Sequence, residues 1–253
     1  MNKIKVIFNA DDFGLTKGVN LGIIETFKNG PVRSTTIMAG ADEFEHAVKL
    51  SKDNPNLKVG IHLTLTAINS VGGVYQTLTD EKGKLLPLSI IEQRAREGKL
   101  NLEEVEVEYQ AQIEKVLQAG IKPSHLDSHH HTHGLLGVQD VVLKVARKYG
   151  IDKIRMVDNG PPESMRGGLQ TTDYFEVGFF GEGATFKNLK KLLRNVKKGS
   201  VEVMVHPGYM DSVLPEISSY NKMRNVEKDI LTSEELREFL KQGNYEIADF
   251  SDL

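Results

Sequence analysis

The chain contains no cysteine. Disulfide bonds and thiolate catalysis are therefore excluded, and any metal site must use histidine, carboxylate or carbonyl ligands. The net charge is −3, without the basic excess typical of nucleic-acid-binding proteins. No apolar run approaches the ~18–20 residues of a membrane span, and no signal-peptide core precedes the first strand pattern. We expect a cytoplasmic protein that binds neither nucleic acid nor membrane.

Short β-rich runs and helical patterns alternate along the 253 residues, with no linker or internal repeat between them. Such alternation is typical of a parallel sheet covered by helices. We predict one domain, residues 1–253, in which roughly three quarters of the unfolded surface is buried. The predicted strands, with the turns that follow the fourth and sixth, cover residues 4–10, 35–40, 58–66, 124–133, 153–157, 201–208 and 245–250. The predicted helices cover residues 19–27, 43–51, 102–119, 138–149, 186–196 and 233–241.

Three segments lack clear periodicity. Residues 67–100 contain several glycines and are interpreted as an insertion over one end of the fold. Residues 159–184 are rich in Gly and Pro and are interpreted as a long functional loop. Residues 209–231 are predicted to be irregular. We expect the first two segments to lie over the end of the sheet that carries the functional site.

A β/α barrel and an open doubly wound sheet both fit this order of elements. Polar residues at the ends of many strands favour the barrel, because those ends converge on one mouth in a barrel and stay apart in an open sheet. These residues are Asp11, Asp12, His62, Asp127, His129, Arg155 and His206. The prediction is a single-domain, distorted, TIM-like barrel of about seven parallel strands.

The stretch of residues 124–133 holds five of the eight histidines, together with Asp127. Imidazole and carboxylate are common ligands of catalytic divalent metals. The alternatives are a solvated, tag-like run or a chance cluster, but a tag would sit at a terminus. In an extended chain alternate residues share a face, with His130 facing away. The shared face would carry His125, Asp127, His129, His131 and His133.

Asp11 and Asp12 follow the first predicted strand. Adjacent strand residues face opposite ways, so both carboxylates reach one site only if the chain turns there. Two carboxylates this close raise the pKa of one of them, which suits a base beside a metal ligand. The alternative is ordinary turn chemistry before Gly14.

His62, His206 and Arg155 each have a structural and a functional interpretation. His62 interrupts an apolar strand and His206 precedes a Pro-Gly turn, so either could be a core or edge residue. Arg155 is interpreted as an ion-pair partner of an acidic residue or as a contact to substrate.

Three blocks of sequence resemble the signature of the YdjC-like carbohydrate deacetylases, a family that includes chitooligosaccharide deacetylases. They read NADDFG at residues 9–14, GIHLTLT at 60–66 and HLDSHHH at 125–131, with weaker support at 203–208 and 231–233. The resemblance implies a distorted seven-stranded β/α barrel that hydrolyses an N-acetyl group on a sugar. It implies a divalent metal held by Asp12, His62 and His129, with Asp11 as the base.

On this resemblance we expect metal-assisted hydrolysis of an acetylated amino sugar or short chitooligosaccharide, with or without a phosphate group. His206 would protonate the departing amine and Asp127 would orient a ligand histidine. Remaining groups expected to orient ligands or contact substrate are His125, His131, His133 and Arg155. The resemblance favours Mg²⁺, whereas the ligand set suits Zn²⁺ equally well. Alternatives are a metal-dependent phosphoesterase or sugar isomerase, or a non-catalytic metal- or sugar-binding protein. A homodimer acting on a small carbohydrate is expected.

Overall fold

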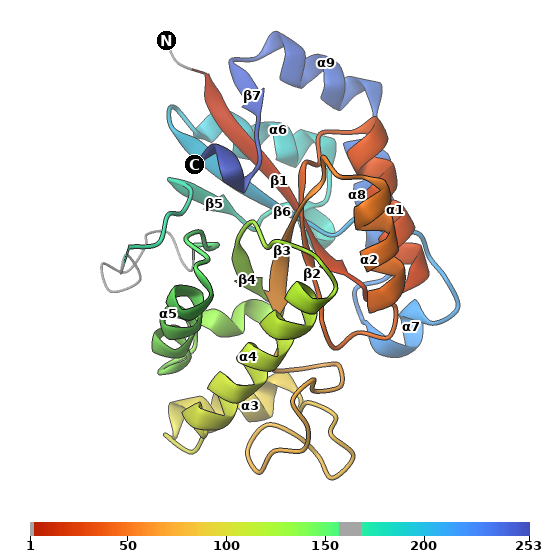
Figure 1. The fold of residues 1–253 in the computed structure, drawn as a ribbon. Coiled ribbons are helices and arrows are strands. Elements are labelled where there is room, and N and C mark those ends of the chain that lie inside the picture. The colour runs from red at the N-terminus through yellow and green to blue at the C-terminus, as the bar shows by residue number, and fades with distance from the viewer. Residues whose placement is uncertain (1–2, 157–167) are drawn as a thin grey trace.

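The structure, a computed structural model, describes residues 3–156 and 168–253. A parallel sheet forms its centre, with helices packed around it (Figure 1). The strands are β1 (Ile4–Phe13), β2 (Ser34–Ile37), β3 (Lys58–Leu63), β4 (Leu126–Ser128), β5 (Tyr174–Glu176), β6 (Ser200–Val205) and β7 (Tyr245–Ile247). The α-helices are α1 (Lys17–Asn29), α2 (Phe44–Asp53), α3 (Leu88–Arg96), α4 (Leu102–Gln118), α5 (Val138–Tyr149), α6 (Phe186–Asn195), α7 (Leu214–Ile217), α8 (Lys222–Leu231) and α9 (Glu234–Gln242).

The strands lie in the order β4-β3-β2-β1-β6-β5, and adjacent strands in this order pair in parallel. β7 pairs with Ile4–Val6 at the start of β1, before β2 begins to pair at Asn9. The sheet is curled, and no ladder joins its end strands β4 and β5 in the described residues. It is therefore a half-barrel and not a closed barrel. The predicted distorted parallel barrel is confirmed.

β1 has two different faces, because alternate strand residues point to opposite sides. Val6, Phe8 and Ala10 pack into the main hydrophobic core beneath the surrounding helices. Ile7 instead belongs to a small cluster with Ala248 and Phe250. The polar side chains of Asn9 and Asp11 continue the face that begins at Ile7, so the concave face is apolar at one end and polar at the other.

The helices cover the outer face of the sheet (Figure 1). α1 contacts both α2 and α8, and α4 packs against α5. Thr16 caps α1 by accepting a hydrogen bond from the Val19 N–H, and Asn101 caps α4 in the same way. Among the residues described, no helix is both long and apolar enough to cross a membrane.

Three local predictions were wrong. The predicted strand 153–157 makes only isolated bridges at Lys153 and Ile154, and Val157 lies outside the described residues. Strand β5 lies instead within the predicted loop 159–184, of which residues 159–167 are likewise outside the described part. The segment 209–231, predicted to be irregular, contains α7 and α8. Residues 67–100 contain α3 as well as loops.

Candidate active site

A bulge at the end of β1 brings two adjacent carboxylates to the same cavity. The β1–β2 register shifts between Ala10 and Phe13, and Asp12 has a positive φ of 69°. Aspartate tolerates this left-handed conformation better than most residues do. The turn that the sequence required is therefore present, and both Asp11 and Asp12 line a cavity of about 650 Å³.

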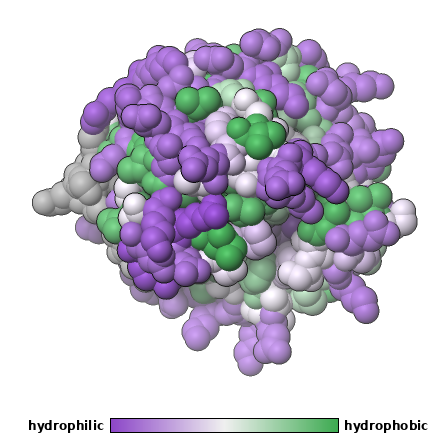
Figure 2. Space-filling view, turned by 90° about the horizontal axis from the view of Figure 1, so that it is seen from below, coloured by the Kyte–Doolittle hydropathy of each residue, from purple (hydrophilic) through white to green (hydrophobic). Residues whose placement is uncertain are grey.

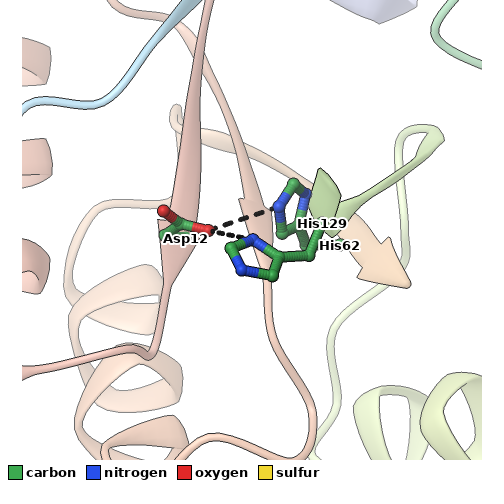
Figure 3. A group of neighbouring side chains, drawn as sticks. All are labelled: Asp12, His62 and His129. Carbon is green, nitrogen blue, oxygen red and sulfur yellow. Dashed lines mark ion pairs between the residues drawn. The ribbon is translucent and has the colours of Figure 1, made fainter. Parts of the chain in front are cut away.

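Asp12, His62 and His129 all line this cavity, and their side chains point toward one another (Figure 3). Asp12 Oδ1 lies 3.3 Å from His62 Nε2 and 3.0 Å from His129 Nδ1. This buried oxygen accepts no well-formed hydrogen bond. An unsatisfied carboxylate oxygen facing two imidazole nitrogens is the donor set expected of a divalent metal site with open positions. The residues present therefore fit a metal ion, and the three predicted ligands are brought together.

Asp127 holds the His62 ring from behind. Asp127 Oδ1 lies 2.7 Å from His62 Nδ1, and Thr36 donates a hydrogen bond to Asp127 Oδ2 at 3.0 Å. With Nδ1 engaged in this way, His62 Nε2 is directed to Asp12. A carboxylate that orients a ligand imidazole is a common arrangement at metal sites. The structure places Asp127 in such a position, and its role stays a prediction.

The carboxylates around His62 favour its protonated form. Burial alone would lower the pKa of His62, but Asp127 and Asp12 outweigh that effect and raise it to about 10. The pKa of Asp12 lies well below its usual range, because Arg224 and His129 outweigh the effect of burial. At neutral pH the metal-free site therefore holds an ionised Asp12 and an imidazolium at His62.

A metal ion must displace the His62 proton, because only the neutral imidazole can coordinate. Below the His62 pKa, affinity should therefore rise with pH, about tenfold per unit between pH 6 and 9 if one proton is released. Isothermal titration calorimetry in buffers of different ionisation enthalpy measures both the affinity and the proton count. Asp127→Asn should flatten this dependence, since it removes the charge that favours the imidazolium. Affinity that does not change over this range would contradict the prediction.

Arg155 lies fully buried among three carboxylates. Its Nη2 donates to Asp11 Oδ1 at 2.6 Å, and its Nη1 donates to Asp11 Oδ2 at 2.7 Å. Its Nε donates to Glu202 Oε1 at 2.8 Å, and Nη1 also lies 3.0 Å from Asp127 Oδ2. The structure thus favours the ion-pair interpretation of Arg155 over contact with substrate. Burial raises the pKa of Glu202 to about 7, although Arg155 opposes the shift. The bidentate pair fixes the orientation of Asp11.

His206 lines the same cavity and lies near Asp11. Its Nε2 lies 3.9 Å from Asp11 Oδ2, and its buried Nδ1 has no hydrogen-bond partner. Burial lowers the pKa of His206 to about 4, although Asp11 and Asp12 oppose the shift. The ring is therefore neutral at pH 7 and close enough to Asp11 to exchange a proton after a small movement.

The histidine stretch does not continue as a strand. β4 ends at Ser128, and a 3-10 turn follows in which His130 and His131 adopt positive φ angles of 56° and 54°. The predicted alternation therefore fails beyond Ser128. His130, expected to face away, lines the cavity together with His129 and His131.

His125 and His133 lie away from the cavity lining. His125 is buried at the apolar end of the concave face. Its ring stacks on that of Phe250, with the two ring centroids 3.6 Å apart. His133 is buried and its Nδ1 is hydrogen-bonded to Ser128. These residues were expected to orient a ligand or to contact substrate; their positions outside the cavity lining do not match the second role, and the first stays a prediction.

Arg224 on α8 was not anticipated from the sequence. Its Nη2 donates to Asp12 Oδ2 at 2.6 Å, and its Nε donates to the backbone carbonyl of Tyr220 at 2.8 Å. Arg224 thus occupies one oxygen of Asp12 and leaves Oδ1 for the histidines. The spacing of Met223, Val226 and Ile230 is compatible with a helix and was the available signal, although the buried face carries Arg224 instead.

Fold and site together define an α/β half-barrel protein with a candidate metal centre at the carboxyl ends of its strands. Residues 5–242 match the family of YdjC-like proteins. The chain is 43% identical over 253 residues to a carbohydrate deacetylase of Listeria monocytogenes serotype 4a (strain HCC23), covering 99% of this chain and 100% of that one. The chain belongs to the YdjC-like family.

Solved structures share the fold. A crystal structure from Enterococcus faecalis V583, named for a proposed role in cellobiose-phosphate cleavage, superposes with a TM-score of 0.87 and 32% identity. The match covers 100% of this chain and 99% of that chain. An esterase of Streptococcus mutans has a TM-score of 0.55 at 14% identity, over 98% of this chain and 86% of that one. The second likeness concerns the fold alone.

Proposed function

We propose that the protein is a divalent-metal-dependent carbohydrate deacetylase that removes the N-acetyl group from an amino sugar or short chitooligosaccharide. The observation that carries this proposal is the group Asp12, His62 and His129 in one cavity with Asp11 and His206. Relatives that match the chain end to end and are named carbohydrate deacetylases support it. When bound, the metal ion would supply Lewis acidity to the amide carbonyl and lower the pKa of a water molecule.

The residues around the ion would handle the protons. Asp11, held by Arg155, would accept a proton from water as the water oxygen attacks the carbonyl carbon. His206 is neutral at pH 7, so it must gain a proton before it can donate one. A small movement that shortens the 3.9 Å between Asp11 and His206 would let the proton taken from water pass to the imidazole. His206 would then protonate the amine nitrogen as the C–N bond breaks, leaving acetate and a free amino sugar.

The proposed activity should disappear on removal of the metal. Chelator-treated protein should release no acetate from N-acetylglucosamine oligomers, and addition of Mg²⁺ or Zn²⁺ should restore release. We propose Mg²⁺ as the native ion with Zn²⁺ as the alternative, and elemental analysis of the purified protein decides between them. Full activity in exhaustively chelated protein, with no metal detected, would contradict the proposal.

Assays for the other possible products, run beside the acetate assay, separate the rival activities. Phosphate release from sugar phosphates would indicate a phosphoesterase, and interconversion of aldose and ketose would indicate an isomerase. Sugar binding with none of these products would indicate a binding protein. Phosphorylated and unphosphorylated N-acetyl sugars, assayed side by side, show whether a phosphate group is required.

A further inference from the structure

Three exposed apolar side chains lie together in the lining of the candidate active-site cavity. Val177 and Phe180 follow β5, and Ile217 ends α7. Their exposed fractions are 47%, 44% and 44%. Figure 2 views the end of the molecule where the strands finish, and hydrophobic groups interrupt the hydrophilic surface there. Exposed apolar groups that gather at a cavity generally mark a contact with a ligand. We call these three residues the apolar wall.

Phe180 is held firmly in this wall. Its ring stacks on Tyr220 with the centroids 4.0 Å apart and the planes 19° from parallel. The Tyr220 hydroxyl donates to Glu227 on α8 and accepts a hydrogen bond of 3.1 Å from the Gly181 N–H. The Phe180 ring is thus supported before any ligand arrives, which lowers the entropic cost of binding.

The apolar wall adjoins the groups proposed to carry out the reaction. The Phe180 ring lies 5.3 Å from the His206 ring, edge to face. His206 in turn faces Asp11 at 3.9 Å. A ligand ring resting on Phe180 would therefore place its substituents beside the two residues that handle protons.

The cavity is also lined by exposed polar side chains from other segments. Asp42 precedes α2, and Asn69 and Lys84 belong to the segment 67–100; all three are exposed and line the cavity. A ligand that suits both kinds of lining has apolar C–H groups on its faces and hydrogen-bonding groups around its edge. A pyranose ring has this distribution, and its C–H groups pack favourably on the electron-rich face of an aromatic ring.

We propose that the apolar wall is the binding subsite for the pyranose ring that bears the N-acetyl group, with Phe180 as the stacking residue. The inference rests on the proposed function, because it assigns the position of the sugar in the same cavity. It predicts a loss of sugar affinity when the aromatic face is removed and the metal group is left intact.

The test measures binding of N,N′-diacetylchitobiose to chelator-treated full-length protein by saturation-transfer NMR, so that turnover does not interfere. Phe180→Ala should weaken binding about tenfold or more, the scale of a lost aromatic contact with its buried area. It should also remove saturation of the sugar ring protons. Phe180→Tyr, which keeps the aromatic face, should stay within about threefold of the unaltered protein. Leu117→Ala, which truncates a 40%-exposed side chain on α4 outside the cavity, is the matched control.

The outcomes separate this inference from the proposed function. If Phe180→Ala binds the disaccharide as tightly as Leu117→Ala does, with the same ring-proton saturation, the subsite is wrong even if acetate is released. Failure of the unaltered protein to bind the sugar would also overturn it. If Phe180 proves necessary for binding but no acetate is released with metal present, the subsite stands and the deacetylase proposal fails. Unchanged metal affinity in Phe180→Ala shows that the loss is specific to the sugar.

Discussion

His129→Ala is expected to abolish both metal binding and acetate release. The substitution removes one of two imidazole nitrogens that face Asp12 Oδ1, and it leaves His62 and Asp12 as the remaining donors. Two protein ligands do not make the site of three that catalytic metal centres generally use. Elemental analysis after dialysis against the ion measures occupancy, and acetate release measures turnover.

His131→Ala provides the comparison for this prediction. His131 lines the cavity but is not in the three-residue group. Its removal should leave the site occupied at saturating metal. Metal affinity or the rate of acetate release should fall by about 10–100-fold at most, as is typical when a residue beyond the direct ligands is changed. Full metal occupancy in His129→Ala, or loss of metal in His131→Ala alone, would reverse the assignment.

Asp11→Asn should keep the metal and lose most of the turnover. The amide retains the shape of the carboxylate but cannot accept a proton, and a positioned general base contributes about 10²–10⁴-fold in rate. Arg155 would keep Asp127 and Glu202 as anionic partners, so the buried guanidinium is not left uncompensated. The rate constant for acetate release and metal occupancy are measured on the same preparation.

Asp12→Asn is the matched variant, because it makes the same chemical change one residue away. We expect it to lose metal as well as turnover, since Asp12 Oδ1 faces both ligand histidines. Thermal unfolding of both variants shows whether either substitution acts through stability. If the two variants bind metal equally well, the separation of roles between the adjacent carboxylates is wrong.

The alternation of strands and helices could be predicted because buried parallel strands leave short apolar runs. β5 could not, since it is a three-residue, partly exposed strand in a Gly- and Pro-rich segment. α8 was obscured for a different reason. Its buried face carries Arg224 and Glu227 as well as Leu231, whereas Val226 is exposed, so the usual amphipathic pattern is weakened. Arg224 is paired with Asp12, and Glu227 accepts hydrogen bonds from the His206 N–H and the Tyr220 hydroxyl, contacts that exist only in the folded chain.

The candidate site could be predicted only as a set of residues. Alternation placed His125 and Asp127 on one side of the strand. His125 nevertheless stacks on Phe250 at the apolar end of the concave face, whereas Asp127 contacts His62 at the polar end. Beyond Ser128 the alternation failed, because positive φ angles at His130 and His131 are rare for such residues and are imposed by surrounding structure. Asp12, His62 and His129 came from the family resemblance. Nothing in local sequence indicates that Arg224 reaches Asp12.

The contact between Arg224 and Asp12 spans 212 positions in the chain. Asp12 is therefore synthesised 212 residues before the arginine that contacts it. Until α8 has been synthesised and has docked beside α1, the Asp12 carboxylate lacks the arginine contact that occupies its Oδ2. A nascent or prematurely terminated chain thus carries the histidines and aspartates of the centre without their arrangement. The arrangement of the centre is therefore complete only after α8 has been synthesised and has packed.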